Sequence, residues 1–367
     1  MTDRRWRRLL DFFDAPPQPL IGVDLGPTSI KCVELSMARS GEIVLEGYVI
    51  EPSPKDSFND QGIANPDILG AALARAWKRL GTKTRRIAIA IPASAAITKK
   101  VRMSNNLDEL AMAEETQSEA ASFLTFPIED VFVDWVVLGP HPSHPEADNE
   151  VLVCASRNDR IQDYLSMAEA AGLEAAVVDI DAFAQQRAFE MLISPGISPS
   201  SITAVAETGY SSMSISIHGR EALLFHKEIH FGESHLIEAI SQTYGVSRSQ
   251  AEDFKNLHGH SLAEYSTLAL RPFLARLGLE IDRAIKLAVA QGATKKVDKI
   301  LLSGSCCFFD EAAKAIEDCS GISTSHANPL AMLPQSARMK KTAEEADGSA
   351  LMAACGLALR KFDSRKT

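Results

Sequence analysis

The sequence predicts a mixed α/β protein built as two lobes. Its 367 residues exceed what a single compact core usually holds. One strand–turn–strand motif also occurs twice, over 20–35 and over 204–217, and internal similarity of this kind indicates two related halves. The segments around the two motifs alternate between strand-like and helix-like patterns, which is typical of mixed sheets covered by helices.

The first motif has the residues that a phosphate-binding turn needs. An apolar run ends in Asp24 and Gly26, and the chain turns before it resumes as a strand at Ile30. Gly26 allows backbone N–H groups to approach phosphate oxygens, and the Thr28 and Ser29 hydroxyls add donors. Asp24 repels phosphate unless a cation lies between them, and Mg²⁺ held through water suits that position. A single copy is also compatible with an ordinary hairpin.

The second motif repeats this spacing and favours the phosphate-binding interpretation. Its residues are Glu207, Gly209, Ser211 and Ser212, at the positions that Asp24, Gly26, Thr28 and Ser29 occupy in the first copy.

Two hairpins of this kind are the signature of the actin-like ATPase fold, and the chain resembles the type IV pilus assembly protein PilM family, relatives of the division protein FtsA. The stretches 90–99 and 118–129, followed by Val133-Asp-Trp135, carry this resemblance most specifically. It extends over roughly residues 19–360. The resemblance implies two lobes, each with a mixed sheet and helices, and an FtsA-like inserted subdomain in the first lobe.

The resemblance and the pattern of elements together divide the chain. The expected parts are a basic and aromatic tail with a Pro-rich spacer (1–18), the first-lobe core (19–98), the inserted small α/β subdomain (99–174), first-lobe core with the inter-lobe link (175–200), the second-lobe core with the second phosphate hairpin (201–231), a helical subdomain over the nucleotide (232–296), and second-lobe core with the closing helix (297–367). Asn65, Pro66 and Gly81 predict the two ends of one helix, and Asn106 with Glu109 predicts the start of another.

The resemblance implies a site for ATP and Mg²⁺. Nucleotide-binding residues would be Asp24, Gly26, Thr28, Ser29, Lys31, Glu207, Gly209, Ser211, Ser212, Gly232, Glu252, Lys255, Gly304 and Ser305, with Asp24 and Glu207 holding the metal through water.

Several positions in and around this site have alternative interpretations or depart from the family pattern. Asp181 lies where relatives place an acidic residue near the attacking water, but a helix N-cap fits equally well. Glu252 and Lys255 would contact ribose or base, or form a surface ion pair at i,i+3. Relatives carry Asp at the position of Glu207, which puts metal coordination there in doubt. They carry glycines at the positions of Ser305 and Cys306, so the affinity for adenine is expected to be reduced.

Composition and charge limit the classes of function that the chain can have. A net charge of −10 argues against broad nucleic-acid binding. Neither an apolar run of 18 residues nor a signal peptide is visible, so a cytoplasmic protein is expected. The six cysteines are expected to be small buried hydrophobes, and the nine histidines to be structural. Residues 1–14 combine arginines with aromatic residues, which suits a helix on an anionic membrane or on a partner, or a leader packed against the first lobe.

The expected function is that of an ATP-binding assembly factor for type IV pili and twitching motility, at the inner face of the inner membrane. The resemblance implies that it binds the cytoplasmic N-terminal peptide of a PilN-like inner-membrane protein, and it allows pilus motor ATPases as further partners. The sequence shows no strong catalytic base, so slow ATP hydrolysis or none is expected. The alternatives are an FtsA-like division scaffold, a small-molecule kinase of the same superfamily, and a scaffold without nucleotide.

Overall fold

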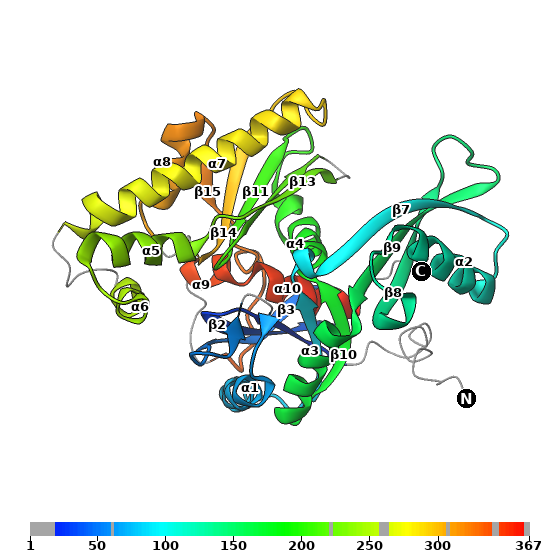
Figure 1. The fold of residues 1–367 in the computed structure, drawn as a ribbon, viewed down its shortest axis with the longest axis horizontal. Coiled ribbons are helices and arrows are strands. Elements are labelled where there is room, and N and C mark those ends of the chain that lie inside the picture. The colour runs from blue at the N-terminus through cyan, green and yellow to red at the C-terminus, as the bar shows by residue number, and fades with distance from the viewer. Residues whose placement is uncertain are drawn as a thin grey trace. The chain divides into compact units, whose positions relative to one another are not determined.

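A computed structural model describes residues 19–59, 62–219, 223–256, 264–305, 309–339 and 345–362, and the structural statements below concern these residues (Figure 1). The tail at 1–18 and Cys306 lie outside them. Contacts within the chain define two compact units. The first comprises the residues up to Glu34, Glu51–Ala184 and the residues from Leu357 onward; the second comprises Leu35–Ile50 and Gln185–Gly356.

The first main sheet has the strand order β10-β6-β1-β2-β3. Strand β1 is antiparallel to β2 and parallel to β6, and β6 is parallel to β10. Buried aliphatic side chains on both faces of β6, and the buried residues Ile21, Gly22 and Val23 of β1, explain why these strands lie inside the sheet. The strands are β1 (Ile21–Leu25), β2 (Ser29–Met37), β3 (Ile43–Pro52), β6 (Arg86–Ile91) and β10 (Glu174–Ile180).

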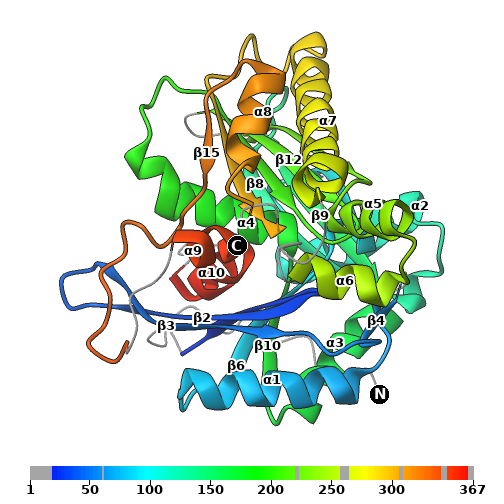
Figure 2. The same ribbon diagram turned by 90° about the vertical axis from the view of Figure 1, so that its left-hand side faces the viewer.

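Helices α1 (Pro66–Leu80) and α3 (Asn158–Ala170) lie next to each other in the first unit (Figure 2). The predicted ends of α1 are confirmed, because the Asn65 side chain accepts from the Ile68 N–H and Gly81 ends the helix in the left-handed conformation. Gly70 brings the two helices close together. A Cβ atom there would lie 2.7 Å from the Ala170 Cβ and 2.7 Å from the Met167 carbonyl oxygen. Thus α3, which the sequence assigns to the insert, packs on the helix of the main sheet.

A separate three-stranded antiparallel sheet, in the order β7-β9-β8, lies within the first unit. Helix α2 covers it, and Met103, Met112 and Val153 belong to the small core between them. Asp108, whose side chain accepts from the Ala111 N–H, begins α2, so the predicted start at Asn106 is wrong by two residues. The elements are β7 (Ala96–Ser104), α2 (Glu109–Phe123), β8 (Val131–Pro140) and β9 (Asp148–Arg157), with the short pieces β4 (Phe58–Asn59), β5 (Gly62–Ile63), η2 (Ala93–Ala95) and η3 (Ile128–Asp130) elsewhere in the unit.

The second unit repeats the plan of the first sheet. Its strand order is β13-β12-β11-β14-β15, with β11 antiparallel to β12 and parallel to β14. Strands β1, β2, β6 and β10 therefore correspond to β11, β12, β14 and β15, which is the internal duplication that the two sequence motifs predict. The strands are β11 (Thr203–Thr208), β12 (Met213–His218), β13 (Leu223–Ile229), β14 (Lys299–Gly304) and β15 (Thr324–His326).

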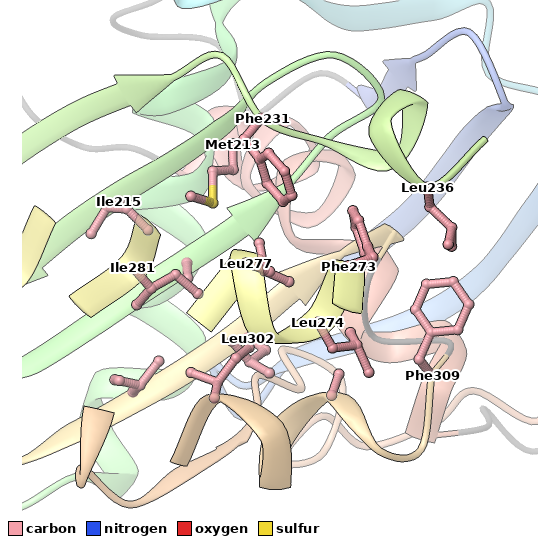
Figure 3. Close-up of a cluster of buried hydrophobic side chains, with 14 of the residues drawn as sticks. Met213, Ile215, Phe231, Leu236, Phe273, Leu274, Leu277, Ile281, Leu302 and Phe309 are labelled. Carbon is pink, nitrogen blue, oxygen red and sulfur yellow. The ribbon is translucent and has the colours of Figure 1, made fainter. Parts of the chain in front are cut away.

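The core of the second unit lies between this sheet and its helices. Helices α7 (Arg271–Ala290) and α8 (Ala312–Ser320) lie side by side in both ribbon views (Figures 1 and 2). Leu277 and Ile281 of α7 meet Met213, Ile215 and Leu302 from the strands (Figure 3). Phe231 and Phe273 stack with ring centroids 5.4 Å apart. This packing fixes the ends of β11 and β14, where the predicted site residues lie.

The remaining helical elements complete the second unit and the chain end. The π turn η6 (Ser266–Leu270) continues directly into α7. The others are α4 (Asp181–Ala188), η4 (Phe189–Ile193), η5 (Ser194–Gly196), α5 (Glu233–Tyr244), α6 (Arg248–Asn256), α9 (Glu345–Ala350), α10 (Met352–Leu359) and η8 (Arg360–Phe362). Within the described ranges, no helix has the length and apolar character needed to cross a bilayer.

Candidate functional site

The first hairpin turn is held by bonds that engage its carbonyl oxygens. The Gly26 N–H donates to the Ser29 carbonyl oxygen at 3.0 Å and closes the turn. Ser53, which follows β3, donates from Oγ to the Gly26 oxygen at 2.6 Å and from its N–H to the Thr28 oxygen at 3.1 Å. Because these carbonyls already have donors, the polar groups that remain for a ligand on the exposed Thr28 are its hydroxyl and its N–H.

Asp24 and Lys31 form an ion pair across this hairpin. The Lys31 Nζ lies 2.8 Å from the Asp24 Oδ2, and the two side chains are 17% and 19% exposed. The residues are direct cross-strand partners in β1 and β2. Lys31 therefore balances the Asp24 carboxylate and places a cation beside the phosphate-binding turn.

The second hairpin has the same closing bond and a different cross-strand pair. The Gly209 N–H donates to the Ser212 carbonyl oxygen at 2.8 Å, as Gly26 does to Ser29. The cross-strand partner of Glu207 is Ser214, at the position that Lys31 occupies in the first copy. The Glu207 Oε2 accepts from the Ser303 Oγ at 3.3 Å. The two hairpins thus have the same closing backbone hydrogen bond. They differ in the residue opposite the carboxylate, which is a lysine in the first hairpin and a serine in the second.

Gly232 and Gly304 are packed against the second hairpin. A Cβ atom on Gly232 would lie 2.6 Å from the Gly209 oxygen, and one on Gly304 would lie 2.2 Å from the Thr208 oxygen. Gly304 also has φ +81°, a conformation that side chains disfavour. The Ser305 Oγ donates to the Thr208 oxygen at 3.1 Å. Both glycines are therefore required by close backbone approach within the protein itself, a role that the sequence analysis did not assign to them.

Glu252 and Lys255 bond to neighbouring elements. The Tyr210 hydroxyl donates to the Glu252 Oε1 at 3.0 Å and accepts from the Arg248 Nη2 at 3.2 Å. Lys255 pairs with Glu233, the first residue of α5. Burial lowers the pKa of Lys255 to about 8. These contacts join α6 to the hairpin and to α5, in place of the i,i+3 ion pair between Glu252 and Lys255. The predicted contact of the two residues with ribose or base stays a prediction.

Asp181 is the first residue of α4, and its Oδ1 accepts two backbone donors. These are the N–H groups of Ala182 at 2.6 Å and of Ala93 at 2.9 Å. The second donor lies in the turn between β6 and β7. Asp181 thus ties that turn to the start of α4, and neither contact is the bond to the second or third helical N–H that an N-cap makes.

Three side chains of this region were missed by sequence reasoning. Tyr210 lies inside the second motif and Glu233 follows the predicted site residue Gly232, so their place in the sequence could have indicated them. Ser53 gives no such signal, because its contact with the first turn exists only in the folded sheet.

The cysteines and histidines give no sign of a metal centre in the described ranges. No group of three or more His, Cys, Asp and Glu side chains there could hold an ion. Cys32 and Cys355 are buried thiols, and burial raises the pKa of Cys32 to about 12. These two cysteines agree with the prediction of small buried hydrophobes.

Comparison with known proteins identifies the family. The family described as type IV pilus assembly protein PilM matches residues 22–362. A solved structure, the PilM–PilN type IV pilus biogenesis complex, superposes with a TM-score of 0.79 at 22% identity and covers 95% of this chain and 100% of that chain. The ethanolamine utilization protein EutJ from Carboxydothermus hydrogenoformans superposes with a TM-score of 0.51 at 14% identity, over 96% and 94% of the two chains. The chain therefore has the actin-like ATPase fold and belongs to the type IV pilus assembly protein PilM family.

Proposed function

We propose that this type IV pilus assembly protein binds ATP with Mg²⁺ through residues 24–29 and 207–212. The observation that supports this most is the repeated turn, in which Gly26 bonds to Ser29 and Gly209 bonds to Ser212 in the same way. Turns that direct backbone N–H groups outward favour anionic oxygens. Two such turns on matching strands suit the phosphate chain of a nucleotide.

The residues present fit such a ligand. Thr28, Ser29 and Ser211 supply hydroxyl donors beside the turns, and Lys31 supplies a cation. The Ser212 Oγ donates to the Glu228 Oε1 at 2.9 Å, so Ser212 would contribute its backbone N–H instead. Asp24 and Glu207 lie at the ends of β1 and β11, where a carboxylate can hold the water shell of Mg²⁺. When bound, the nucleotide brings negative charge that these donors neutralise. Slow hydrolysis at most is expected, because the Asp181 Oδ1 already accepts two backbone N–H groups.

Calorimetric titration of the full chain with ATP and Mg²⁺ tests this proposal. We expect saturable binding that is lost in Gly26→Val, because the added side chain fills the space beside the turn. Gly196→Val is the matched control, since a Cβ on Gly196 meets no atom within 4 Å and its φ is not positive. A folded protein that shows no heat of binding would contradict the proposal and leave an actin-like scaffold without nucleotide.

We further propose that the first unit binds the cytoplasmic N-terminal peptide of a PilN-like inner-membrane protein. Family membership supports this partner, and the bend between α2 and η3 carries an exposed aromatic side chain for it. Phe126 is 40% exposed, and the Arg157 guanidinium lies 5.1 Å from its ring centroid. In this proposal the bound nucleotide changes the populations of conformations that differ in affinity for the peptide.

Titration with a synthetic peptide of the PilN leader, with and without ATP, measures this coupling. Phe126→Ala is expected to weaken peptide binding, whereas Leu268→Ala, an equally exposed apolar position on η6, is expected to leave it unchanged. Equal peptide affinity with and without ATP would refute the nucleotide switch while leaving the scaffold role intact.

Placement at the inner face of the inner membrane and contact with pilus motor ATPases complete the proposal. Residues 1–14 would reach the lipid surface. Co-sedimentation with anionic vesicles, compared between the full chain and a variant lacking 1–14, tests that contact.

A further inference from the structure

The second unit has a pocket at the end of its sheet remote from the phosphate-binding turn. Its volume is about 200 Å³. Thr203 and His218, which are cross-strand partners at the far ends of β11 and β12, line it together with Phe189, Gly219 and residues of 194–201. Thr203 lies five positions before Thr208, which is at the hairpin end. Because a strand rises about 3.3 Å per residue, the pocket lies about 17 Å along β11 from that end.

The pocket combines aromatic and hydroxyl groups and carries no charge. Phe189 and His218 stack with ring centroids 4.2 Å apart. His218 is only 3% exposed, and burial lowers its pKa to about 4, so the imidazole is neutral at physiological pH. Its Nε2 lies 2.8 Å from the Ser216 Oγ. Ser194, Ser198 and Ser201 add hydroxyls to the lining, and Pro195 and Pro199 add apolar ring surface.

Thr203 supplies a hydrogen-bonding group that the described part of the chain does not satisfy. It is 1% exposed, and its Oγ1 has no hydrogen-bond partner there. A buried hydroxyl without a partner raises the free energy of the folded state, so a molecule in the pocket that bonds to it is favoured. The pocket also borders η4, a π turn, and such turns occur frequently at functional sites.

We propose that this pocket binds a small, uncharged aromatic or heteroaromatic molecule that carries a hydroxyl or amide group. The stacked rings and the prolines suit a planar apolar body, and Thr203 suits its polar group. The uncharged lining excludes an ionised ligand, because burying a charge without a partner is costly. The volume is below the roughly 300–1,000 Å³ of pockets for drug-sized molecules, which restricts the ligand to about one ring system. This site is independent of the proposed nucleotide binding.

Phenol, toluene and benzoate are the probes that test this chemistry. They share a ring and differ in carrying a hydroxyl, a methyl or a charge. The δ-methyl signal of Ile197, which lines the pocket, reports binding in NMR titrations of the full chain. We expect saturable binding of phenol, and at least about tenfold weaker binding of toluene and of benzoate. ATP at saturation should leave the phenol affinity unchanged.

Two variants separate the pocket from general effects on folding. Thr203→Val keeps the side-chain shape and removes the Thr203 hydroxyl, which has no hydrogen-bond partner in the described residues. It should therefore weaken phenol binding about tenfold without lowering the urea midpoint of unfolding. Ser198→Trp, at an exposed position of the lining, should block all three probes. No saturable shift of Ile197 with phenol, equal affinity of the Thr203→Val protein, or displacement of phenol by ATP would each overturn the proposal.

Discussion

Lys31 pairs with Asp24 across the first hairpin, whereas the same two positions in the second hairpin hold Ser214 and Glu207. The duplicated backbone has therefore kept its shape while the electrostatics of its two copies diverged. Only the first copy places an ammonium group directly opposite its carboxylate. The two carboxylates are expected to respond differently to Mg²⁺ and to substitution.

Lys31→Met should destabilise the protein by about 1–3 kcal/mol, because it leaves the partly buried Asp24 carboxylate without this counter-charge. Urea unfolding measures the change. The double variant Lys31→Met with Asp24→Asn is the control, and it should recover most of the lost stability. If the double variant is as unstable as the sum of the two single variants, the pair does not act as a unit.

Tyr210→Phe should lower stability by about 1–2 kcal/mol, because its hydroxyl joins Glu252 and Arg248 to the hairpin. Tyr265→Phe is the matched control. The Tyr265 hydroxyl is buried and has no partner in the described residues, so its removal should be neutral or slightly stabilising. Urea midpoints of the two variants that move by the same amount would contradict the role given to Tyr210.

Gly70→Ala should destabilise the first unit by about 1–3 kcal/mol, although alanine favours helices more than glycine by about 1 kcal/mol. The reason is the Ala170 Cβ, which a new Cβ on Gly70 would approach to 2.7 Å. The control is Ala71→Gly on the exposed side of α1, which should lose only the helix-propensity difference. A Gly70→Ala protein that melts at a higher temperature would refute the close packing of α1 on α3.

His218 should make the protein sensitive to acid. Burial lowers its pKa to about 4, below the ordinary value of 6.5 that the unfolded chain retains. Between these values the unfolded state binds more protons, so stability is complete above about pH 6.5 and falls as the pH drops toward 4. The loss from this group is about 3 kcal/mol. Urea unfolding from pH 7 to pH 4 should show a shallower loss in His218→Gln, and an unchanged slope would count against this assignment.

The sequence predicted those helix ends and turns that depend on residues close together in the chain. Asn65, Pro66 and Gly81 bound α1 as expected, because caps act within one helical turn. The predicted start of α2 at Asn106 was wrong, because the Asp108 side chain accepts from the Ala111 N–H. Both residues are suitable N-caps, and the backbone conformation decides which of them begins the helix. The repeated motif predicted the duplicated sheet, since its spacing is a property of the strand and turn themselves.

Tertiary partners were beyond the reach of the sequence. Glu252 and Lys255 are three residues apart and suggested a local pair, but their partners Tyr210 and Glu233 come from other elements. Gly304 is predicted to bind nucleotide, and the sequence gives no sign that the Thr208 carbonyl of the adjoining strand also requires a glycine there. Such contacts depend on which segments the fold brings together, and a single sequence carries no direct record of that.

Leu357 belongs to the apolar cluster that contains Leu20, Ala88 and Ala184, although residues 185–356 of the second unit come between Ala184 and Leu357 in the chain. During synthesis the ribosome makes nearly all of the first unit before residues 185–356, and Leu357 after them. The first unit therefore cannot close its core until the second has been translated. A chain truncated before Leu357 should expose that apolar surface and be a substrate for chaperones and proteases, so the cell receives either both units folded or neither.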